Sequence, residues 1–362
     1  MSPPAQIEAL VTADAHRAEV KLVPLPKLES NEVLVKVLNV TLNPTDWKHI
    51  ALLSPPGNIA GCDFCGVVED VAPDAKGNVK VGDKVAGFVH GGKYSDRGSF
   101  AQYLNTSSEL VMKVPEGLDN DVASSVAVAG ETAALALFGR LGLPNPDPAK
   151  ELPEITRDSP ALLVWAGSTA VGQYAVQLGR AAGYRVITTA SPKNHELLKS
   201  MGAYETHDYR DESTPEKIAK AHPDLSKALD CISENGTQSL CVRSLGEQGG
   251  EVVVLLKPES DAIKLRDSVK ITHILAYTCL GRPFTYGKAE FGQDIVDKDS
   301  AFIKQWLNGD QGLFHHLFKN KRITGNKIKH MEGGLHAVTE GLKYLQEGKV
   351  SAEKLAYTID VV

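Results

Sequence analysis

The stretch that most constrains the fold is residues 160–194. Residues 161–165 (Ala-Leu-Leu-Val-Trp) are a continuous apolar run that predicts a buried strand, and a turn of small side chains follows at 166–172. The next residues place apolar side chains on one face of a helix, at Val171, Ala175, Leu178 and Ala182. A second apolar strand is predicted at 184–189. Strand, turn, helix and strand in this order predict the start of a dinucleotide-binding βαβ unit.

The end of the second strand indicates which dinucleotide binds. An NAD-binding fold usually presents an acidic residue there to the ribose hydroxyls, whereas this chain has Ser191, Pro192, Lys193 and Asn194. A lysine ammonium, a serine hydroxyl and an asparagine amide can bind the oxygens of a 2′-phosphate, so we expect NADPH. The alternative is that Ser191 and Asn194 cap a helix that begins near His195, and the two roles are compatible.

Length, composition and charge favour a globular protein of two domains. The 362 residues are 42% hydrophobic and 23% charged, with a formal net charge of -6 and no block of basic residues that would indicate a nucleic acid or a membrane surface as partner. No segment has the apolar length of a membrane span, and the first residues lack the pattern of a signal peptide. The odd number of five cysteines fits a reducing compartment, so we expect a cytoplasmic protein.

The chain before residue 144 predicts a compact β-barrel lobe followed by helix. Gly, Pro and Asp turns separate short β-rich segments, and helical periodicity begins near 122 and continues through 132–138. Residues 144–160 are rich in proline and predict an exposed loop. Strands of the lobe are predicted at 7–11, 20–23, 32–40, 65–71, 79–87 and 99–104.

From residue 161 onward, predicted strands and helices alternate, which is typical of a doubly wound parallel sheet. The helices are expected to about residue 182 and from 195 to 202. The carboxyl-terminal part has amphipathic helices near 301–307 and 335–346 and a final strand at 354–361, which we expect to rejoin the first lobe. The predicted domains are therefore 1–128 with 288–362, and 129–287. Further strands are predicted at 205–208, 227–232 and 250–256.

Several motifs resemble one superfamily in order and spacing. Residues 42–48 (Leu-Asn-Pro-Thr-Asp-Trp-Lys), 61–68, 81–87, 130–134 and 166–172 are similar to the medium-chain dehydrogenases/reductases. Within that superfamily, 141–144 with its long loop, 190–194, 207–210, 228–232 and 345–355 resemble the trans-acting enoyl reductases of fungal polyketide pathways, the lovastatin type. The resemblance implies an α/β protein with a GroES-like β-barrel catalytic lobe and a doubly wound Rossmann domain.

The resemblance also implies site residues. Lys48 and Thr132 are the expected catalytic residues, although an isolated lysine is often a solvated surface residue. Small side chains in the turn let backbone N–H groups approach a pyrophosphate, the alternative being an ordinary tight turn. The expected cofactor-binding residues are Thr45, Asp46, Trp47, Lys48, Ser168, Thr169, Ala170, Val171, Ser191, Pro192, Lys193, Asn194, Tyr209, Leu255, Leu256, Ser351 and Ala352. The expected substrate pocket consists of Gly130, Glu131, Thr132, Ala133, Ala134, Leu135, Ala136, Ala276, Tyr277, Thr278, Cys279 and Leu280, of which the apolar runs are alternatively core.

No metal site is expected. Zinc-dependent relatives have a cysteine in place of Asn43, a Gly-His-Glu in place of 61–63, and a four-cysteine lobe in the region of 86–103, which has no cysteine here. The pair Cys62 and Cys65 lacks a second pair at zinc-site spacing, so both are expected to be small packed residues.

Without zinc, hydride transfer suits an acceptor that is already activated, such as an α,β-unsaturated thioester. Hydride reaches the β-carbon, an enolate develops at the thioester oxygen, and the α-carbon takes a proton whose donor stays open between Lys48, Thr132 and water. The resemblance implies a monomer that acts in secondary metabolism on acyl chains held by the carrier protein of a polyketide synthase. The alternatives are a free-standing quinone or alkenal reductase and a non-catalytic NADPH-binding structural protein.

Overall fold

The structure is a computed structural model that describes residues 3–14 and 16–359. The chain divides into two compact units. The first comprises Met1–Val128, Tyr277–Lys319 and Asn326–Val362, and the second comprises Ala129–Ala276 with Asn320–Gly325. Relative to the predicted domains, the second border lies at 276 instead of 287, and a short later segment joins the second unit.

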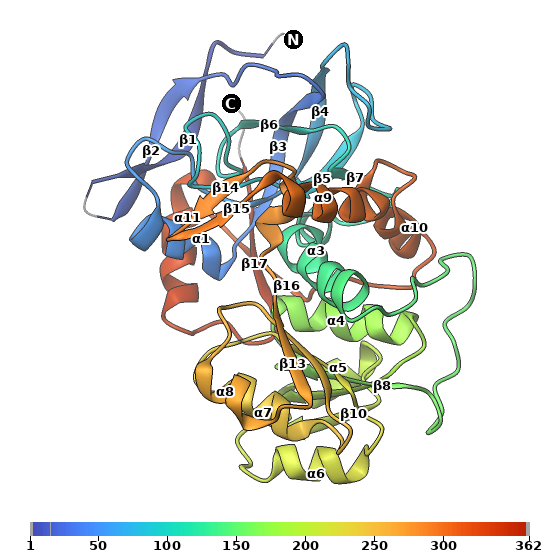
Figure 1. Cartoon of the computed structure of the whole chain (residues 1–362). Helices are drawn as coiled ribbons and strands as arrows, with labels where there is room; N and C mark the ends of the chain where they lie inside the picture. The colour runs from blue at the N-terminus through green and yellow to red at the C-terminus, as the bar shows by residue number, and fades with distance from the viewer. Residues whose placement is uncertain (1–2, 15, 360–362) are drawn as a thin grey trace. The chain divides into compact units, whose positions relative to one another are not determined.

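The first unit is built on a seven-stranded sheet in the order β16-β17-β3-β4-β5-β7, with β6 pairing β3 on the side (Figure 1). The β3 strand is central because it pairs with β17, β4 and β6. A separate antiparallel pair is formed by β1 (Gln6–Ala13) and β2 (Arg17–Pro24). The strands of the large sheet are β3 (Glu32–Thr41), β4 (Asp63–Val71), β5 (Lys84–Phe88), β6 (Tyr103–Ser107), β7 (Val111–Lys113), β16 (Ile328–Met331) and β17 (Lys354–Thr358).

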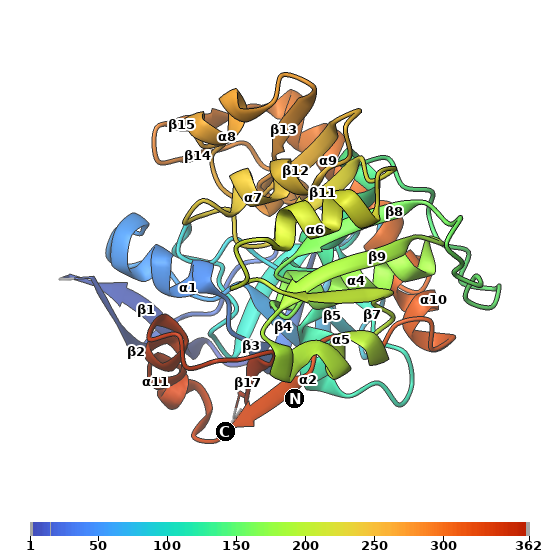
Figure 2. The same ribbon diagram turned by 90° about the horizontal axis from the view of Figure 1, so that it is seen from below.

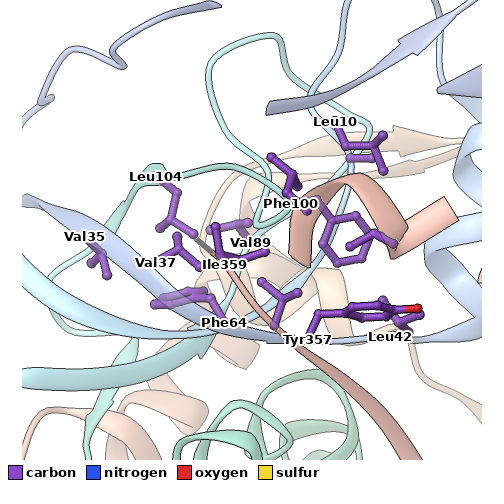
Figure 3. Close-up of a cluster of buried hydrophobic side chains, with 14 of the residues drawn as sticks. Leu10, Val35, Val37, Leu42, Phe64, Val89, Phe100, Leu104, Tyr357 and Ile359 are labelled. Carbon is purple, nitrogen blue, oxygen red and sulfur yellow. The ribbon is translucent and has the colours of Figure 1, made fainter. Parts of the chain in front are cut away.

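Side chains from these strands and their connections fill one interior (Figure 3). Phe64, Phe100 and Tyr357 are its large aromatic members, and each is at most 1% exposed. β-branched residues of β3 such as Val35 and Val37 pack among them because alternate positions of a strand face the same side. The carboxyl-terminal strand thus completes the core of the first lobe, as the sequence predicted.

Helices of the first unit lie around this sheet. The short α1 (Pro44–Lys48) continues into a π-helical turn, His49–Leu53, and α1 contacts α11 (Gly334–Gln346). The predicted helix at 335–346 is therefore confirmed, and the one at 301–307 is the end of a longer helix, α9 (Gln293–Leu307). The remaining elements are α2 (Asn120–Ser124), α10 (Leu313–Lys319) and a hairpin of β14 (Phe284–Tyr286) and β15 (Ala289–Phe291).

The second unit contains a six-stranded parallel sheet in the order β10-β9-β8-β11-β12-β13. From the middle of the sheet, the strands follow chain order outward in both directions: β8, β9 and β10 toward one edge, and β11, β12 and β13 toward the other. This is the arrangement of a doubly wound Rossmann fold and confirms the predicted architecture. The helices α4 (Ala170–Ala181) and α7 (Thr237–Ser244) cover opposite faces of this sheet (Figure 1), and Figure 2 shows β8 beside β9. The strands are β8 (Ala161–Trp165), β9 (Arg185–Ala190), β10 (Glu205–Asp208), β11 (Lys227–Asp230), β12 (Gly250–Val254) and β13 (Val269–His273).

Helices of the second unit begin with α3 (Glu131–Ala134), which extends as a π-helical turn to Arg140. No helix or strand occupies 144–160, so the predicted loop is confirmed. Within the described ranges, no helix is both long and apolar enough to cross a membrane. The other helices are α4 (Ala170–Ala181), α5 (His195–Ser200), α6 (Thr214–Ala221), α7 (Thr237–Ser244) and α8 (Ser260–Leu265).

The strands predicted at 227–232 and 250–256 each extend two residues beyond β11 and β12, and three other strand predictions differ more from the structure. The strand predicted at 99–104 begins at Tyr103, because Ser99 and Phe100 donate backbone hydrogen bonds to Gly61 and Ala60 in a crossing connection (2.8 and 3.0 Å). The strand predicted at 79–87 begins at Lys84, after a turn. The final strand ends at Thr358, and the predicted continuation through residues 360 and 361 lies outside the described part of the chain.

Candidate functional site

The turn between β8 and α4 is held against the neighbouring strand by its own backbone. Ala166 has a φ of 63°, a left-handed conformation, and its N–H donates to Thr189 Oγ1 at 2.9 Å. The next N–H, that of Gly167, donates to the Thr189 carbonyl at 3.0 Å. Two hydrogen bonds to one residue of β9 therefore fix the direction in which the turn leaves the sheet.

The two glycines of the turn are required by close packing. A Cβ on Gly167 would lie 2.1 Å from Thr188 Oγ1, and a Cβ on Gly172 would lie 2.5 Å from the Ala166 carbonyl oxygen. Ala166 occupies a position at which related turns often have glycine. It adopts the left-handed conformation although it carries a methyl side chain. The turn thus keeps glycine where a neighbour leaves no space.

The first turn of α4 is capped by Thr169, and the sequence predicts that a pyrophosphate binds at this end of the helix. The Thr169 hydroxyl accepts from the Gly172 N–H at 3.0 Å and donates to the Ala166 carbonyl at 2.9 Å. Residues 168–171, all predicted cofactor contacts, are partly exposed at the N-terminus of a 12-residue helix. The helix dipole and backbone N–H groups at such a terminus favour an anion.

After β9 the chain makes a single 3-10 turn, Pro192–Asn194, before α5. The backbone N–H of Asn194 donates to the Ser191 carbonyl at 2.8 Å, but neither the Ser191 nor the Asn194 side chain makes a capping hydrogen bond. The alternative role of these two side chains as helix caps is therefore not what the structure shows. Lys193 is exposed at the same turn.

Tyr209 directly follows β10 and is 48% exposed, with the Arg210 guanidinium 5.9 Å from its ring centre. Tyr209 and Trp165 line a cavity of about 470 Å³ in the second unit. An exposed aromatic face beside a cavity is suited to stack on a flat ring, which is compatible with the cofactor contact predicted for Tyr209.

Leu255, which with Leu256 is a predicted cofactor-binding residue, is held by the loop that follows β11. The Leu255 N–H donates to Ser233 Oγ at 2.7 Å, and Ser233 Oγ donates to the Asp230 carbonyl at 2.8 Å. The Asp230 carboxylate in turn accepts from the Ser233 N–H and from Thr237 Oγ1. The loops after β11 and β12 are thereby joined, and Leu256 remains 37% exposed.

In the first unit, α1 is anchored by a buried ion pair. Lys354 Nζ lies 2.9 Å from Asp63 Oδ2, and the two side chains are 2% and 0% exposed. Lys354 also donates to Asn43 Oδ1 at 2.6 Å, at the residue that precedes α1. Asp63 accepts from Thr41 Oγ1 at 2.8 Å and from the Val128 N–H at 3.0 Å. Residues far apart in the sequence thus hold the start of α1.

Asp46 faces the interior of the unit and is 1% exposed. Its carboxylate accepts from the Asn43 N–H at 2.7 Å. Burial, assisted by the neighbouring charge of Asp63, raises the pKa of Asp46 to about 7. The predicted cofactor contact of Asp46 stays a prediction, and the contacts of its side chain are those of a residue that shapes α1.

The predicted cofactor-side residue Thr45 and the predicted substrate-pocket residue Tyr277 meet in the first unit. Thr45 Oγ1 lies 2.7 Å from the Tyr277 hydroxyl oxygen and 3.1 Å from His49 Nδ1. Cys62 Sγ is 3.5 Å from the same phenol, and the His90 ring stacks on Tyr277 with centroids 3.8 Å apart. Burial raises the pKa of Tyr277 well above its usual value and lowers that of His49. All of these groups are therefore neutral near pH 7.

The two predicted catalytic residues belong to different units. Lys48 is half-buried at the end of α1, with its ammonium 5.7 Å from the centre of the Trp47 ring, so it is not a freely solvated lysine. Thr132 lies on α3 in the second unit and is buried.

The other predicted pocket and cofactor residues are also distributed over both units. Gly130 to Ala136 lie on and beside α3 in the second unit, which also contains Ala276, whereas Tyr277 to Leu280 belong to the first. Of the latter, Thr278 donates to Asp299 Oδ2 at 2.6 Å. Ser351 and Ala352 precede β17, and Ala352 has a φ of 56°.

Sequence reasoning missed His49, Lys354 and the pairing of Thr45 with Tyr277. Lys354 and Tyr277 have partners remote in the chain, and the contact of His49 with Thr45 four residues earlier forms within one helical turn that carries no motif of its own. The expectation that Cys62 and Cys65 are packed is confirmed, since both are 0% exposed. Among the described residues, no group of three or more His, Cys, Asp or Glu side chains is arranged to hold a metal ion. The expectation of zinc-free chemistry continues to rest on the sequence.

Comparisons with known families and proteins agree with this architecture. The alcohol dehydrogenase GroES-like domain matches residues 29–116, and the zinc-binding dehydrogenase domain matches residues 170–285. A trans-enoyl reductase of Alternaria alternata is 36% identical over 97% of this chain and 98% of its own length. A trans-enoyl reductase of Cochliobolus carbonum is 38% identical over 77% of this chain and 92% of its own length.

Solved structures show the same fold. The quinone oxidoreductase of Coxiella burnetii has a TM-score of 0.72 at 21% identity, covering 98% of this chain and 100% of its own. The CurK enoyl reductase has a TM-score of 0.73 at 18% identity, covering 99% and 100%. At these identities the likeness establishes the arrangement of the chain alone.

Proposed function

Because the chain belongs to the trans-enoyl reductases of the medium-chain dehydrogenase/reductase family, we propose that it reduces the α,β-double bond of an enoyl thioester with NADPH. The thioester is carried by the acyl carrier protein of a polyketide synthase, on which the enzyme acts in trans. Family membership makes it an oxidoreductase that uses a nicotinamide cofactor. The choice of NADPH and the individual site residues are our proposals.

The observation that carries the NADPH proposal is the Ser191–Asn194 turn. It places a hydroxyl, an amide and the ammonium of Lys193 directly after β9, with no acidic side chain among them. The Ser191 and Asn194 side chains do not cap the following helix. A hydroxyl, an amide and an ammonium are the donor types that can bind the three oxygens of a 2′-phosphate.

The remaining cofactor contacts follow from the geometry of each unit. The turn at 166–172 and the first turn of α4 would bind the pyrophosphate, Tyr209 the adenine ring, and the joined loops carrying Leu255 and Leu256 the nicotinamide side. Bound NADPH supplies the hydride that adds to the β-carbon of the enoyl thioester. Negative charge then develops on the thioester oxygen and requires donors.

Lys48 is proposed to hold the cofactor's ribose and to stabilise the developing charge. The Trp47 ring beside its ammonium limits the positions of the long side chain, which reduces the entropy lost when it binds. Thr132 on α3 is proposed as the second catalytic residue, and it belongs to the second unit. Both roles derive from the family resemblance together with the partial burial of Lys48 and the burial of Thr132.

The cofactor assignment is tested by Lys193→Ala, with Lys199→Ala on the neighbouring α5 as the matched control. Loss of a charged hydrogen bond of about 1.5–3 kcal/mol is expected to weaken NADPH binding roughly 10- to 100-fold and to leave NADH binding unchanged. Lys199 pairs with Glu196 and is expected to have no effect on either cofactor. Equal weakening of NADPH and NADH by Lys193→Ala would contradict the phosphate role.

The reaction is tested by NADPH oxidation with enoyl thioesters of graded chain length, free and carrier-bound. We expect turnover of the thioesters and higher kcat/KM for the carrier-bound forms. Equal turnover of small quinones or alkenals would contradict the proposal in favour of a free-standing reductase. NADPH binding without reduction of any thioester would indicate a non-catalytic protein.

A further inference from the structure

A group of neutral polar side chains surrounds the Thr45 hydroxyl, and the reaction outlined above does not account for it. Tyr277 and His49 contact Thr45, and Tyr286 of the β14–β15 hairpin lies against both rings. We call Thr45, His49, Tyr277 and Tyr286 the Thr45 cluster. All four belong to the first unit.

Hydrogen-bond roles within the Thr45 cluster follow from burial. His49 Nδ1 lies 2.9 Å from the Thr45 carbonyl oxygen, which can only accept, so the neutral imidazole carries its proton on Nδ1. Tyr277 is 4% exposed and must also place its proton on an acceptor. Thr45 Oγ1 at 2.7 Å is a stronger acceptor than Cys62 Sγ at 3.5 Å. The Tyr277 phenol therefore donates to Thr45.

The Tyr277 ring cannot easily turn away from this contact. His90 stacks on one face at 3.8 Å with an interplanar angle of 12°, and Phe284 meets the ring edge at 6.1 Å. Both neighbouring rings are buried. The phenol is thus held in a fixed position before any ligand binds, which is the condition for a preorganised donor.

A hydroxyl whose oxygen already accepts from a fixed donor directs its own proton elsewhere. Because the Thr45 oxygen accepts from Tyr277, the Thr45 proton is available to another acceptor; Tyr286, half-buried like Thr45, lies against the His49 and Tyr277 rings of the same cluster. An acyl oxygen that reaches Thr45 would be such an acceptor.

We infer that Tyr277 is a positioning residue for the reduction: it donates to Thr45 Oγ1 and so directs the Thr45 O–H to the thioester oxygen as enolate charge develops. The inference rests on the proposed function and adds a donor that the sequence did not reveal. A donor aimed where charge appears stabilises the transition state more than the bound substrate, so its loss acts on kcat. The hydrogen bond from Tyr277 to Thr45 polarises the Thr45 hydroxyl and so strengthens the hydrogen bond that Thr45 donates to the thioester oxygen.

The test compares Tyr277→Phe with the wild-type protein, using a carrier-bound enoyl thioester and NADPH. Removing a single direct oxyanion donor costs about 100- to 1,000-fold in kcat, and an indirect partner is expected to cost less, about 10-fold. The KM for the thioester and the Kd for NADPH are expected to stay unchanged. The kinetic isotope effect with NADPH deuterated at the transferred position is expected to rise, because hydride transfer becomes slower relative to other steps.

Thr45 variants test the same hydroxyl while leaving Tyr277 intact. Thr45→Val is expected to lose about 100-fold in kcat and Thr45→Ser to retain most of it. The double variant with Tyr277→Phe should be no slower than Thr45→Val alone, because the phenol acts only through Thr45. Tyr103→Phe, in the separate hydrophobic cluster of the first unit, is the control and is expected to keep wild-type kinetics.

An unchanged kcat in Tyr277→Phe, or losses that multiply in the double variant, would overturn the inference while leaving the proposed function intact. If Tyr277→Phe does not fold, full activity of Thr45→Val is enough to overturn the inference. Failure of the wild-type protein to reduce any enoyl thioester would overturn both.

Discussion

The nucleotide turn of the second unit and the surroundings of α1 in the first unit are built in different ways. The turn depends on neighbours within one βαβ unit, such as the Ala166 N–H bond to Thr189 and the Thr169 cap. The surroundings of α1 bring together residues from the whole length of the chain, including Asp63, Tyr277 and Lys354. Cofactor binding thus relies on local backbone geometry, and the polar chemistry near α1 relies on long-range packing.

The two constructions should respond differently to mutation. In a local turn, the hydrogen bonds of the backbone are made to other backbone groups or to one hydroxyl. A single substitution that adds no bulk is therefore expected to change stability only modestly. A buried charged network depends on every member, because removing one leaves its partner in a medium that does not solvate it. The following predictions test this contrast.

The largest effect is expected for Lys354→Met, which leaves the Asp63 carboxylate buried without its countercharge. Breaking a buried ion pair by removing one partner costs about 3–5 kcal/mol in the free energy of unfolding, measured by chemical denaturation. Asp63→Asn combined with Lys354→Met removes both charges and should recover part of this loss. A cost below about 1 kcal/mol for Lys354→Met would show that the pair contributes little to holding α1.

The next effect depends on pH and concerns Asp46. Its folded pKa of about 7 lies above the unfolded value of 3.8, so its contribution to stability is present below the unfolded value and is lost as pH rises through the folded one. Between pH 5 and pH 8 the wild-type protein should therefore lose about 2–3 kcal/mol relative to Asp46→Asn. Paired denaturation curves measure this difference, since the other titrating groups cancel. Parallel pH profiles would mean that Asp46 is ionised in the fold.

A smaller effect is expected in the turn from Thr169→Ala. The variant loses the cap that accepts the Gly172 N–H, at a cost of about 1 kcal/mol of stability. Thr169→Ser keeps the hydroxyl and serves as the control. A loss as large as that of Lys354→Met would remove the distinction between the two regions.

The smallest effect on stability is expected from Ser191→Ala, within about 0.5 kcal/mol, because this side chain makes no capping hydrogen bond. Thermal unfolding of the protein without cofactor measures it. NADPH should stabilise this variant less than the wild-type protein, because a phosphate contact is lost. A stability cost equal to that of Thr169→Ala would identify Ser191 as a helix cap after all.

The same contrast explains what could be predicted from the sequence. The order of the Rossmann strands, the turn and the loop at 144–160 were predictable, because hydrophobic periodicity and small residues report local structure. The sixth strand, β13, was missed: its burial is uneven, with only Val269 fully enclosed, so the segment lacks a clear apolar run. The contacts of Lys354 and Tyr277 were not predictable, because one lysine or tyrosine gives no indication of a partner hundreds of residues away.

The domain border predicted at residue 287 shows a related limit of prediction from the sequence, because the structure has the border at residue 276. Composition does not change at 276, yet Tyr277 belongs to the first unit because its ring packs among His90, Phe88 and Phe284. Similarly, the Gln177 side chain on α4 accepts from the Thr324 N–H and donates to the Gly325 carbonyl, which ties 320–325 to the second unit. Such borders are set by contacts that form only when the chain is folded.

The position of β17 has a consequence for synthesis of the protein on the ribosome. This strand lies between β16 and β3, so the part of the first unit that is translated before the second unit lacks an interior strand until residues 354–358 emerge. The six strands of the second unit are contiguous in the chain and need no later strand. The amino-terminal lobe, although made first, is therefore expected to finish folding last, and its exposed β3 edge is the segment of the nascent chain that most needs protection by chaperones.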